Sequence, residues 1–185
     1  MLHVGVNIWY KNRRAVVEIF YHLLSSPGFE DMHLIMVGQP LTKDIQDTIE
    51  KYGLRDRVHV FCGIEHEHLR PLYSFAEGLL FPSLQEGFGW PIIEAQACGC
   101  PVFTSDRPPM SQVAGPISTT FDPLDAPGAA KIIADAFPIT PAARNAAIQN
   151  AKQYSTQNMI EGYLSIFQEF GLSMQLTKPA LNLKI

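Results

Sequence analysis

The run from Phe81 to Cys100 places two carboxylates, Glu86 and Glu94, around two glycines, with seven residues between the acids. A carboxylate accepts two hydrogen bonds side by side, which suits the paired hydroxyls of a sugar or a ribose. Gly87 and Gly89 allow backbone dihedrals that other residues avoid, and they let a ligand come close to the chain. The pattern therefore favours a site that binds hydroxyl groups.

The elements on either side of these glycines predict an anion site as well. An apolar strand, Gly78–Pro82, comes before them, and a helix over Ile92–Ala97 follows, with Pro91 suited to its first position. Free amide groups and the positive end of a helix bind phosphate without any basic side chain. We expect Glu94 in the first turn of this helix, where its charge is favourable. Taken singly, each acid would be an ordinary loop or helix-start residue.

A basic segment, residues 9–14, follows the first apolar strand and forms a second candidate phosphate site. Lys11 is interpreted as the cation of this site. Arg14 is interpreted as part of a solvated first helical turn, and Arg13 fits either role. Because ligands of open parallel sheets lie beyond the carboxyl ends of the strands, both candidate loops would share one edge. Gly38, after the second strand, predicts a close backbone approach near the same edge.

Strand-like and helix-like patterns alternate along the whole chain, which predicts an α/β fold with a Rossmann-like, doubly wound parallel sheet. We expect one domain over residues 1–170 and a tail over 171–185. Segment 106–109 is interpreted as a plain turn. The expected strands are Leu2–Asn7, His33–Val37, Val58–Phe61, Gly78–Pro82, Pro101–Thr104 and Ile117–Phe121. The expected helices include 16–24, Thr42–Tyr52, Glu65–Phe75, Ile92–Ala97, Pro127–Phe137, Ala142–Tyr154 and Thr156–Phe170.

Composition narrows the classes of partner. The 185 residues are 46% hydrophobic and 17% charged, with a net charge of −4, so the surface as a whole favours neither nucleic acid nor an anionic membrane. The three cysteines, Cys62, Cys98 and Cys100, are a poor disulfide framework and indicate a reducing, cytoplasmic compartment. We expect buried or half-buried thiols, because a metal site would need further ligands at suitable spacing. No apolar run approaches the roughly 20 residues that span a bilayer.

The motif Phe-Pro-Ser-x-x-Glu-Gly-Phe-Gly-x-Pro-x-x-Glu-Ala-x-Ala-Cys-Gly-x-Pro-Val is similar to the signature of the family 4 retaining glycosyltransferases. These enzymes have the GT-B fold, in which two Rossmann-like domains face each other across a cleft. The resemblance runs from the first strand to the helix that ends near Phe170. It implies the C-terminal, donor-binding domain of a hexosyl- or mannosyl-type enzyme. Such an enzyme transfers a hexose from a UDP- or GDP-sugar to a glycan or lipid acceptor in glycan biosynthesis.

The resemblance also implies roles for single residues. Glu86 is the implied catalytic residue, beside the donor sugar, where it would help to stabilise the transition state. Glu94 would hold the ribose hydroxyls. An ordinary core aromatic at a strand end is an equally good interpretation of Phe61. The implied donor-binding residues are Lys11, Phe61, Cys62, Gly87, Phe88, Gly89, Trp90 and Glu94.

One departure from the family pattern concerns the basic segment. Many members carry an arginine where this chain has Val6, so Lys11 is left as the main point charge for the diphosphate. Charged hydrogen bonds are the stronger ones, so this departure bears on donor affinity. It favours, as an alternative, a non-catalytic nucleotide-sugar binding module. A GT-B epimerase or phosphorylase is disfavoured by the Glu-x7-Glu spacing.

The remaining expectations concern partners and cofactors. The chain starts directly in a strand, so we expect an acceptor-binding domain N-terminal to residue 1 and little activity without it. Any peripheral membrane contact would be made through that domain. The sequence contains no Asp-x-Asp motif, so neither a metal ion nor a cofactor is expected besides the nucleotide-sugar substrate.

Overall fold

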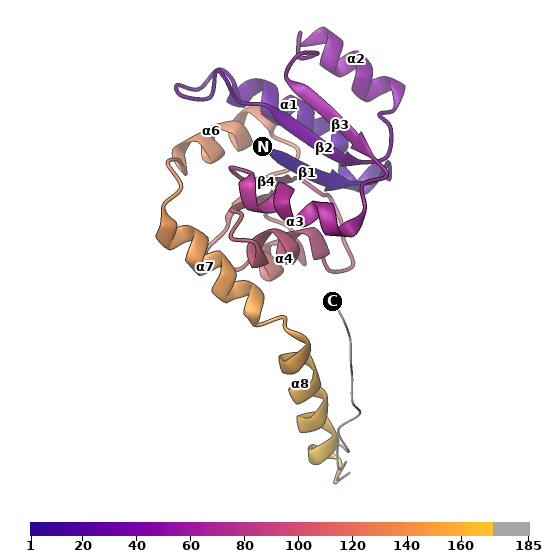
Figure 1. Cartoon of the computed structure of the whole chain (residues 1–185), viewed down its shortest axis with the longest axis vertical. Coiled ribbons are helices and arrows are strands. Elements are labelled where there is room, and N and C mark those ends of the chain that lie inside the picture. The colour runs from indigo at the N-terminus through magenta and orange to yellow at the C-terminus, as the bar shows by residue number, and fades with distance from the viewer. Residues whose placement is uncertain (172–185) are drawn as a thin grey trace. The chain divides into compact units, whose positions relative to one another are not determined.

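The computed structural model describes residues 1–171 (Figure 1). The chain divides into two compact units, Met1–Lys152 and Gln153–Ile185. The first unit holds the whole sheet and both candidate loops. The predicted tail lies outside the described residues, apart from Gly171, and the predicted domain limits of 1–170 stay a prediction.

A six-stranded parallel sheet forms the centre of the first unit, in the order β3-β2-β1-β4-β5-β6. Leu2 pairs with Ile35 on one side and with Leu79 on the other, which sets the register of the central strands. The predicted parallel, doubly wound sheet is thereby confirmed. The strands are β1 (Leu2–Gly5), β2 (Leu34–Gly38), β3 (Val58–Cys62), β4 (Leu79–Phe81), β5 (Val102–Ser105) and β6 (Thr119–Phe121).

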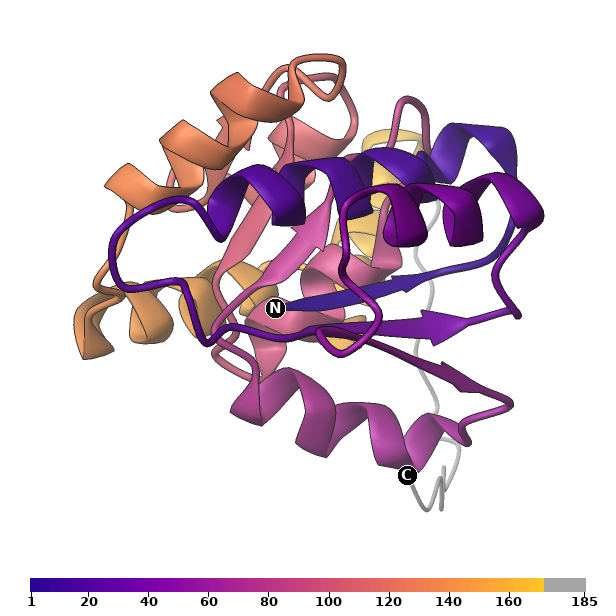
Figure 2. The ribbon, with the colours of Figure 1, turned by 90° about the horizontal axis from the view of Figure 1, so that it is seen from above.

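Helices cover both faces of this sheet. Strand order runs outward from β1 in both directions. Right-handed crossovers therefore place α1 and α2 on one face and the helices that follow β3, β4 and β5 on the other. Figure 2 shows α1 and α2 on one side of the sheet and α3 on the other. The helices are α1 (Arg13–Leu23), α2 (Lys43–Lys51), α3 (His66–Phe75), α4 (Trp90–Ala97), α5 (Met110–Ala114), α6 (Ala126–Asp135) and α7 (Pro141–Lys152).

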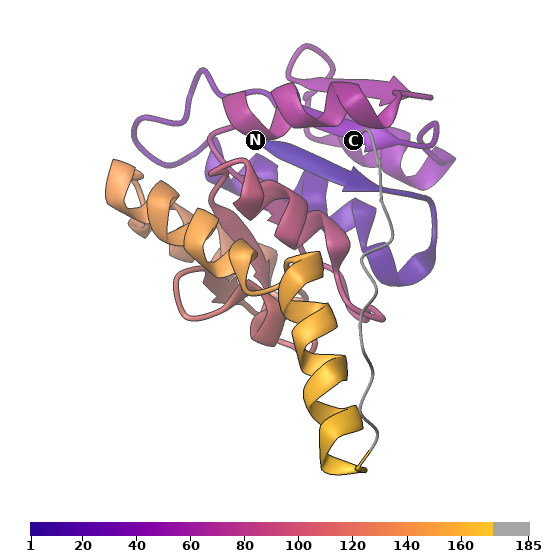
Figure 3. The same ribbon diagram turned by 60° about the horizontal axis from the view of Figure 1, so that its bottom comes forward.

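The packing of these helices buries their apolar faces. On the first face α1 lies between α2 and α6, and its Val16, Phe20 and Leu23 are fully buried. On the second face α4 packs against α3, α5 and α7, and Figure 3 shows α7 running alongside α4. Each fully buried side chain of this size contributes about 1.5–3 kcal/mol relative to an exposed one. The sheet edge that carries both candidate loops therefore rests on a rigid, two-sided core.

One local prediction is confirmed and another needs correction. The turn expected over residues 106–109 is found, and it leads into α5, a helix that was not predicted because it is too short to show periodicity in the sequence. Helix α4 begins at Trp90, two residues before the predicted start, with Pro91 in its first turn. Glu94 therefore lies in the second turn of α4, where the helix dipole acts on it less strongly than predicted.

The second unit contains one described helix, α8 (Thr156–Glu169), within one residue of the prediction. Ser155 caps it, since its hydroxyl accepts a hydrogen bond from the backbone N–H of Asn158 at 3.2 Å. Across residues 1–171, no helix combines the length and the apolar character needed to cross a bilayer.

Candidate functional site

The two candidate loops meet where the strand order reverses. β1 and β4 are neighbours in the sheet, and their crossovers leave in opposite directions, which opens a crevice at their carboxyl ends. The backbone N–H of Leu84 donates to the carbonyl of Tyr10 at 2.7 Å and joins the loops directly. A short 3-10 helix, η1 (Trp9–Lys11), occupies the first loop. The basic segment and the glycine turn thus form one continuous site.

An ion pair spans this site. The Lys11 ammonium donates to Glu86 Oε1 at 2.7 Å, and both side chains are largely buried, with 13% and 9% of their surface exposed. The ammonium also lies 5.0 Å from the centre of the Phe81 ring, close enough for a cation–π contact. A lysine and a carboxylate so close together can exchange partners when an anion or a hydroxyl enters the site.

Asn12 anchors the loop that carries Lys11, a role that the sequence analysis did not assign. It has a left-handed backbone (φ 51°, ψ 40°) between η1 and α1, a conformation that asparagine tolerates better than most residues. Its side-chain amide donates to the carbonyls of Pro82 and Pro123, each at 3.1 Å. The loops after β1, β4 and β6 are therefore tied together at one amide. The sequence feature that could have indicated this role is an asparagine directly before a predicted helix.

The two arginines of the basic segment take different roles. Arg14 forms an exposed pair with Glu18 at 2.9 Å, which confirms its interpretation as a solvated helical residue. Arg13 is buried, with 3% of its surface exposed, so a solvated role is wrong for it. Its guanidinium donates to the Asn7 side chain and, at 3.0 Å, to the Gln39 carbonyl. Arg13 thus joins the loops after β1 and β2 beneath the surface.

The glycine turn has the expected backbone at one of its two glycines. Gly89 has a φ of 98° and caps the start of α4, a conformation that side-chain-bearing residues rarely adopt. Gly87 has no positive φ, so the dihedral argument is wrong there. A Cβ at Gly87 would meet no atom within 4 Å, which leaves open space beside the chain. In the first turn of α4, Pro91 has no N–H and the Ile92 N–H donates to the Gly89 carbonyl at 2.9 Å. The Trp90 N–H and the positive end of the helix dipole are therefore the features of α4 that favour an anion here.

Aromatic side chains and a thiol line the rest of this edge. The Phe88 and Trp90 rings are 4.9 Å apart, and Trp90 is exposed. Phe61, at the end of β3, has 46% of its surface exposed, so its interpretation as a core aromatic is wrong. Cys62 beside it is exposed, contrary to the expectation of buried thiols. That expectation holds for Cys98 and Cys100, which are half-buried and buried; all three thiols are free.

The Glu94 side chain, on α4, is held by a residue of α3 to which the sequence analysis assigned no role. The Tyr73 hydroxyl, on α3, donates to Glu94 Oε2 at 2.9 Å. Burial first, and then the neighbouring Glu94 charge, raise the pKa of the Tyr73 phenol far above its usual range. Tyr73 therefore keeps its proton and acts as a hydrogen-bond donor to the carboxylate. No local pattern signals this contact, since it depends on the packing of α3 on α4.

Comparison with known proteins identifies the family. The profile of the glycosyl transferases group 1 matches residues 1–154, which include the whole sheet and both candidate loops. The chain belongs to the glycosyl transferases group 1 family. This finding confirms the resemblance described above and places both candidate loops within the matched region.

Individual relatives of this group 1 chain are consistent with the family assignment. It is 32% identical over 126 residues to the O-antigen chain mannosyltransferase B of Escherichia coli, covering 67% of this chain and 33% of that protein. The structure of sucrose-phosphate synthase from Thermosynechococcus elongatus covers 92% of this chain at 25% identity, with a TM-score of 0.72; the matched part is 45% of that enzyme. The pneumococcal O-GlcNAc transferase GtfA, solved in complex with UDP and GlcNAc, shares the fold with a TM-score of 0.76 at 18% identity. The match covers 91% of this chain and 35% of the GtfA chain. The group 1 chain thus spans less than half the length of these relatives.

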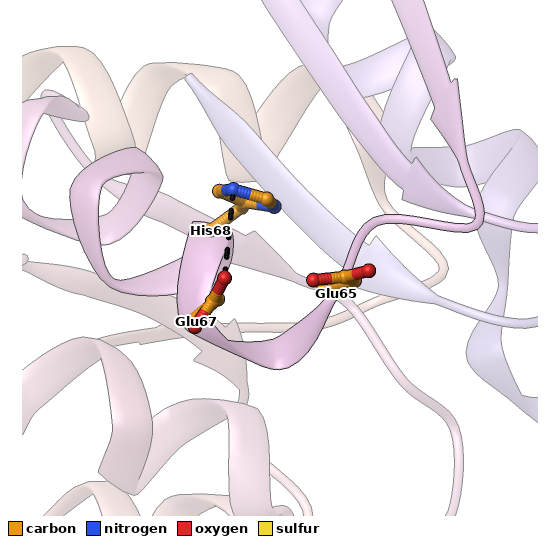
Figure 4. A group of neighbouring side chains, drawn as sticks. All are labelled: Glu65, Glu67 and His68. Atoms are coloured by element: carbon orange, nitrogen blue, oxygen red, sulfur yellow. Dashed lines mark ion pairs between the residues drawn. The ribbon is translucent and has the colours of Figure 1, made fainter.

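A group of potential metal ligands also lies on this group 1 chain, at the start of α3. Within residues 1–171, oxygen and nitrogen atoms of Glu65, Glu67 and His68 lie within 4.8 Å of one another (Figure 4). The His68 ring and the Glu67 carboxylate are 4.0 Å apart. All three side chains are exposed, and exposed acidic groups of this kind are common without an ion. The group therefore does not by itself define a metal site.

Proposed function

We propose that this chain is the donor-binding domain of a retaining glycosyltransferase that uses a nucleotide-diphosphate sugar. The observation that carries the proposal is the site at the β1–β4 crevice. There, the Lys11–Glu86 ion pair lies beside a glycine turn that opens α4. A cation, the positive end of α4 and a carboxylate in one place match the diphosphate and the sugar hydroxyls of such a donor.

The proposed mechanism uses charge and orientation. As the bond between sugar and diphosphate breaks, negative charge grows on the departing phosphate. Lys11 and the positive N-terminal end of α4 are placed to stabilise that charge. Glu86 would accept hydrogen bonds from the donor sugar and help to stabilise the transition state. Glu94 would hold the ribose, and exposed Phe61 with neighbouring Cys62 would meet the base.

The proposed reaction transfers a hexose to a glycan or lipid acceptor. Mannose is the favoured sugar, because several relatives bear the name mannosyltransferase, and UDP- or GDP-sugars are the proposed donors. Since the chain spans a third of the first of these relatives, we propose that a second, N-terminal domain supplies the acceptor site. Any peripheral membrane contact would lie on that domain. Three free thiols support a cytoplasmic location.

Calorimetric titration with UDP, GDP and ADP tests donor binding. One of these nucleotides should bind, and Glu94→Ala should weaken that binding about tenfold, because it removes a charged acceptor of the ribose hydroxyls. Glu50→Ala, which changes an exposed acid on α2, is the matched control and should leave the affinity unchanged. Failure of all three nucleotides to bind would refute the proposal. Equal affinity of wild type and Glu94→Ala would refute the ribose role.

A second candidate, a nucleotide-sugar binding module without catalysis, is favoured by one observation. Val6 replaces the usual arginine, Arg13 is turned toward Asn7 and Gln39, and Lys11 is already paired with Glu86. Assay of the product of the full reading frame separates the candidates. A transferase releases nucleoside diphosphate from its donor, and Glu86→Ala abolishes that release. A module binds the donor and leaves it intact.

We further propose that donor binding requires no metal ion. Lys11 and the positive end of α4 already provide positive charge for a diphosphate. Nucleotide affinity should then be the same in EDTA and in magnesium. A loss of binding in EDTA would refute this part of the proposal, and variants of Glu65 and Glu67 would show whether the exposed group of α3 is responsible.

A further inference from the structure

Tyr73 stands out because it is a phenol buried against a charged group. It lies on α3 with only 2% of its surface exposed, and it is the largest of the fully buried side chains. Its hydroxyl donates to Glu94 Oε2 at 2.9 Å, across the contact between α3 and α4. A buried hydroxyl must find a partner, and here that partner is the carboxylate proposed to hold the ribose.

The contact fixes a side chain that would otherwise rotate freely. Glutamate has three rotatable bonds, and ordering it on ligand binding lowers affinity. A carboxylate offers about four lone-pair positions on two oxygens. Tyr73 occupies one position on Oε2, so Oε1 and a second position on Oε2 can still accept two hydroxyl protons. Since burial and the Glu94 charge raise the pKa of Tyr73, the phenol holds its proton throughout.

We propose that Tyr73 is a positioning residue that sets the orientation of the Glu94 carboxylate for the two ribose hydroxyls of the nucleotide. The inference rests on the proposed function and adds the residue through which the ribose is recognised. It assigns α3 a part in discriminating ribonucleotides from 2′-deoxyribonucleotides. The fold supports this role, because α3 and α4 pack on the same face of the sheet and hold the two side chains at a fixed separation.

A cycle of two ligands and two proteins tests the proposal. The probes are whichever of UDP, GDP and ADP binds the 185-residue chain most tightly, together with its 2′-deoxy form. In the wild type the deoxy form should bind about tenfold more weakly, the worth of one hydrogen bond to a charged acceptor. In Tyr73→Phe the ribonucleotide should lose about three- to tenfold in affinity, and the deoxy form less than about twofold. The ratio of the two dissociation constants should therefore fall by about 1.5-fold to tenfold.

A matched control separates positioning from general destabilisation. Tyr21→Phe removes a hydroxyl from a half-buried tyrosine of α1, whose ring stacks on Tyr52 at 4.1 Å. This variant should keep the wild-type ratio. A structural role of Tyr73 would lower the unfolding midpoint and weaken both nucleotides equally, so an unchanged ratio in Tyr73→Phe would overturn the positioning role. If the wild type binds no nucleotide, the proposed function fails together with this inference. If it binds and the ratio is unchanged, the inference alone fails.

A second measurement needs no variant and stays decisive if Tyr73→Phe does not fold. With an isotope label at Cζ of the tyrosines, the carbon signal of Tyr73 reports its hydrogen bond to Glu94. Binding of the ribonucleotide should shift this signal, because the ribose hydroxyls compete for electron density on the same carboxylate. The 2′-deoxy form should shift it less. Equal shifts with both nucleotides would count against the proposal.

Discussion

The Lys11–Glu86 ion pair leads to a prediction with opposite signs for its two partners. In Glu86→Gln the side chain keeps its shape and loses its charge, so Lys11 is free to meet a diphosphate. We expect this variant to bind a nucleoside diphosphate without sugar more tightly than the wild type. In Lys11→Met the cation itself is lost, so the same ligand should bind more weakly.

The exposure of the pair sets the size of both effects. Exposed ion pairs contribute about 0–1 kcal/mol, and hydrogen bonds to charged groups contribute about 1.5–3 kcal/mol. This pair is 2.7 Å long with 13% and 9% of its side chains exposed, which places it between these cases. Glu86→Gln should therefore improve binding by about 1 kcal/mol, or roughly fivefold. Lys11→Met should weaken binding by about 2 kcal/mol, or roughly thirtyfold, because it loses a charged donor.

Calorimetric titration at low and at high salt provides the assay. Both effects should shrink as salt screens the partly exposed charges. The matched control is Asp135→Asn, which frees Lys131 from an exposed ion pair of similar length, 2.6 Å, on α6. The control should leave nucleotide affinity unchanged. If Glu86→Gln weakens nucleotide binding, Glu86 helps to bind the nucleotide and does not compete with it for Lys11, and the reasoning is refuted. An unchanged affinity in Lys11→Met would refute it as well.

Two further predictions concern the stability of the strands beneath the site. Burial lowers the pKa of His3 to about 3, and its Nδ1–H donates to the Leu80 carbonyl at 3.0 Å. The unfolded chain therefore binds more protons between about pH 6.5 and 3, and the free energy of unfolding should fall by on the order of 2 kcal/mol from pH 7 to 5. His3→Gln should show a shallower slope in denaturant titrations, and an equal slope would contradict this origin. Gly38→Ala should destabilise by at least about 2 kcal/mol, since its φ is +143° and its Cβ would lie 2.0 Å from the Gly5 carbonyl oxygen. Gly28 also has a positive φ, but a Cβ there would meet no atom within 4 Å, so Gly28→Ala should lower the free energy of unfolding by less. An equal loss of stability in the two variants would contradict the steric argument.

The sequence alone determined the local elements and the motif. Alternating apolar strands and amphipathic helices predicted the α/β class, and every predicted strand is found within a few residues. The close approach predicted at Gly38 is confirmed, and so is the strained backbone at Gly89. These features depend on residues near in sequence, where glycine, proline and hydrophobic periodicity act directly.

The tertiary structure decided which of these residues meet. The strand order places β1 beside β4, and it brings together Lys11 and Glu86, which are 75 positions apart. Packing of α3 on α4 gives Glu94 its tyrosine partner, and packing beneath the loops buries Arg13. Burial and pairing depend on which surfaces are brought into contact by the whole fold. For this reason the Glu86 turn could be found in the sequence, whereas the partners that orient its charges could not.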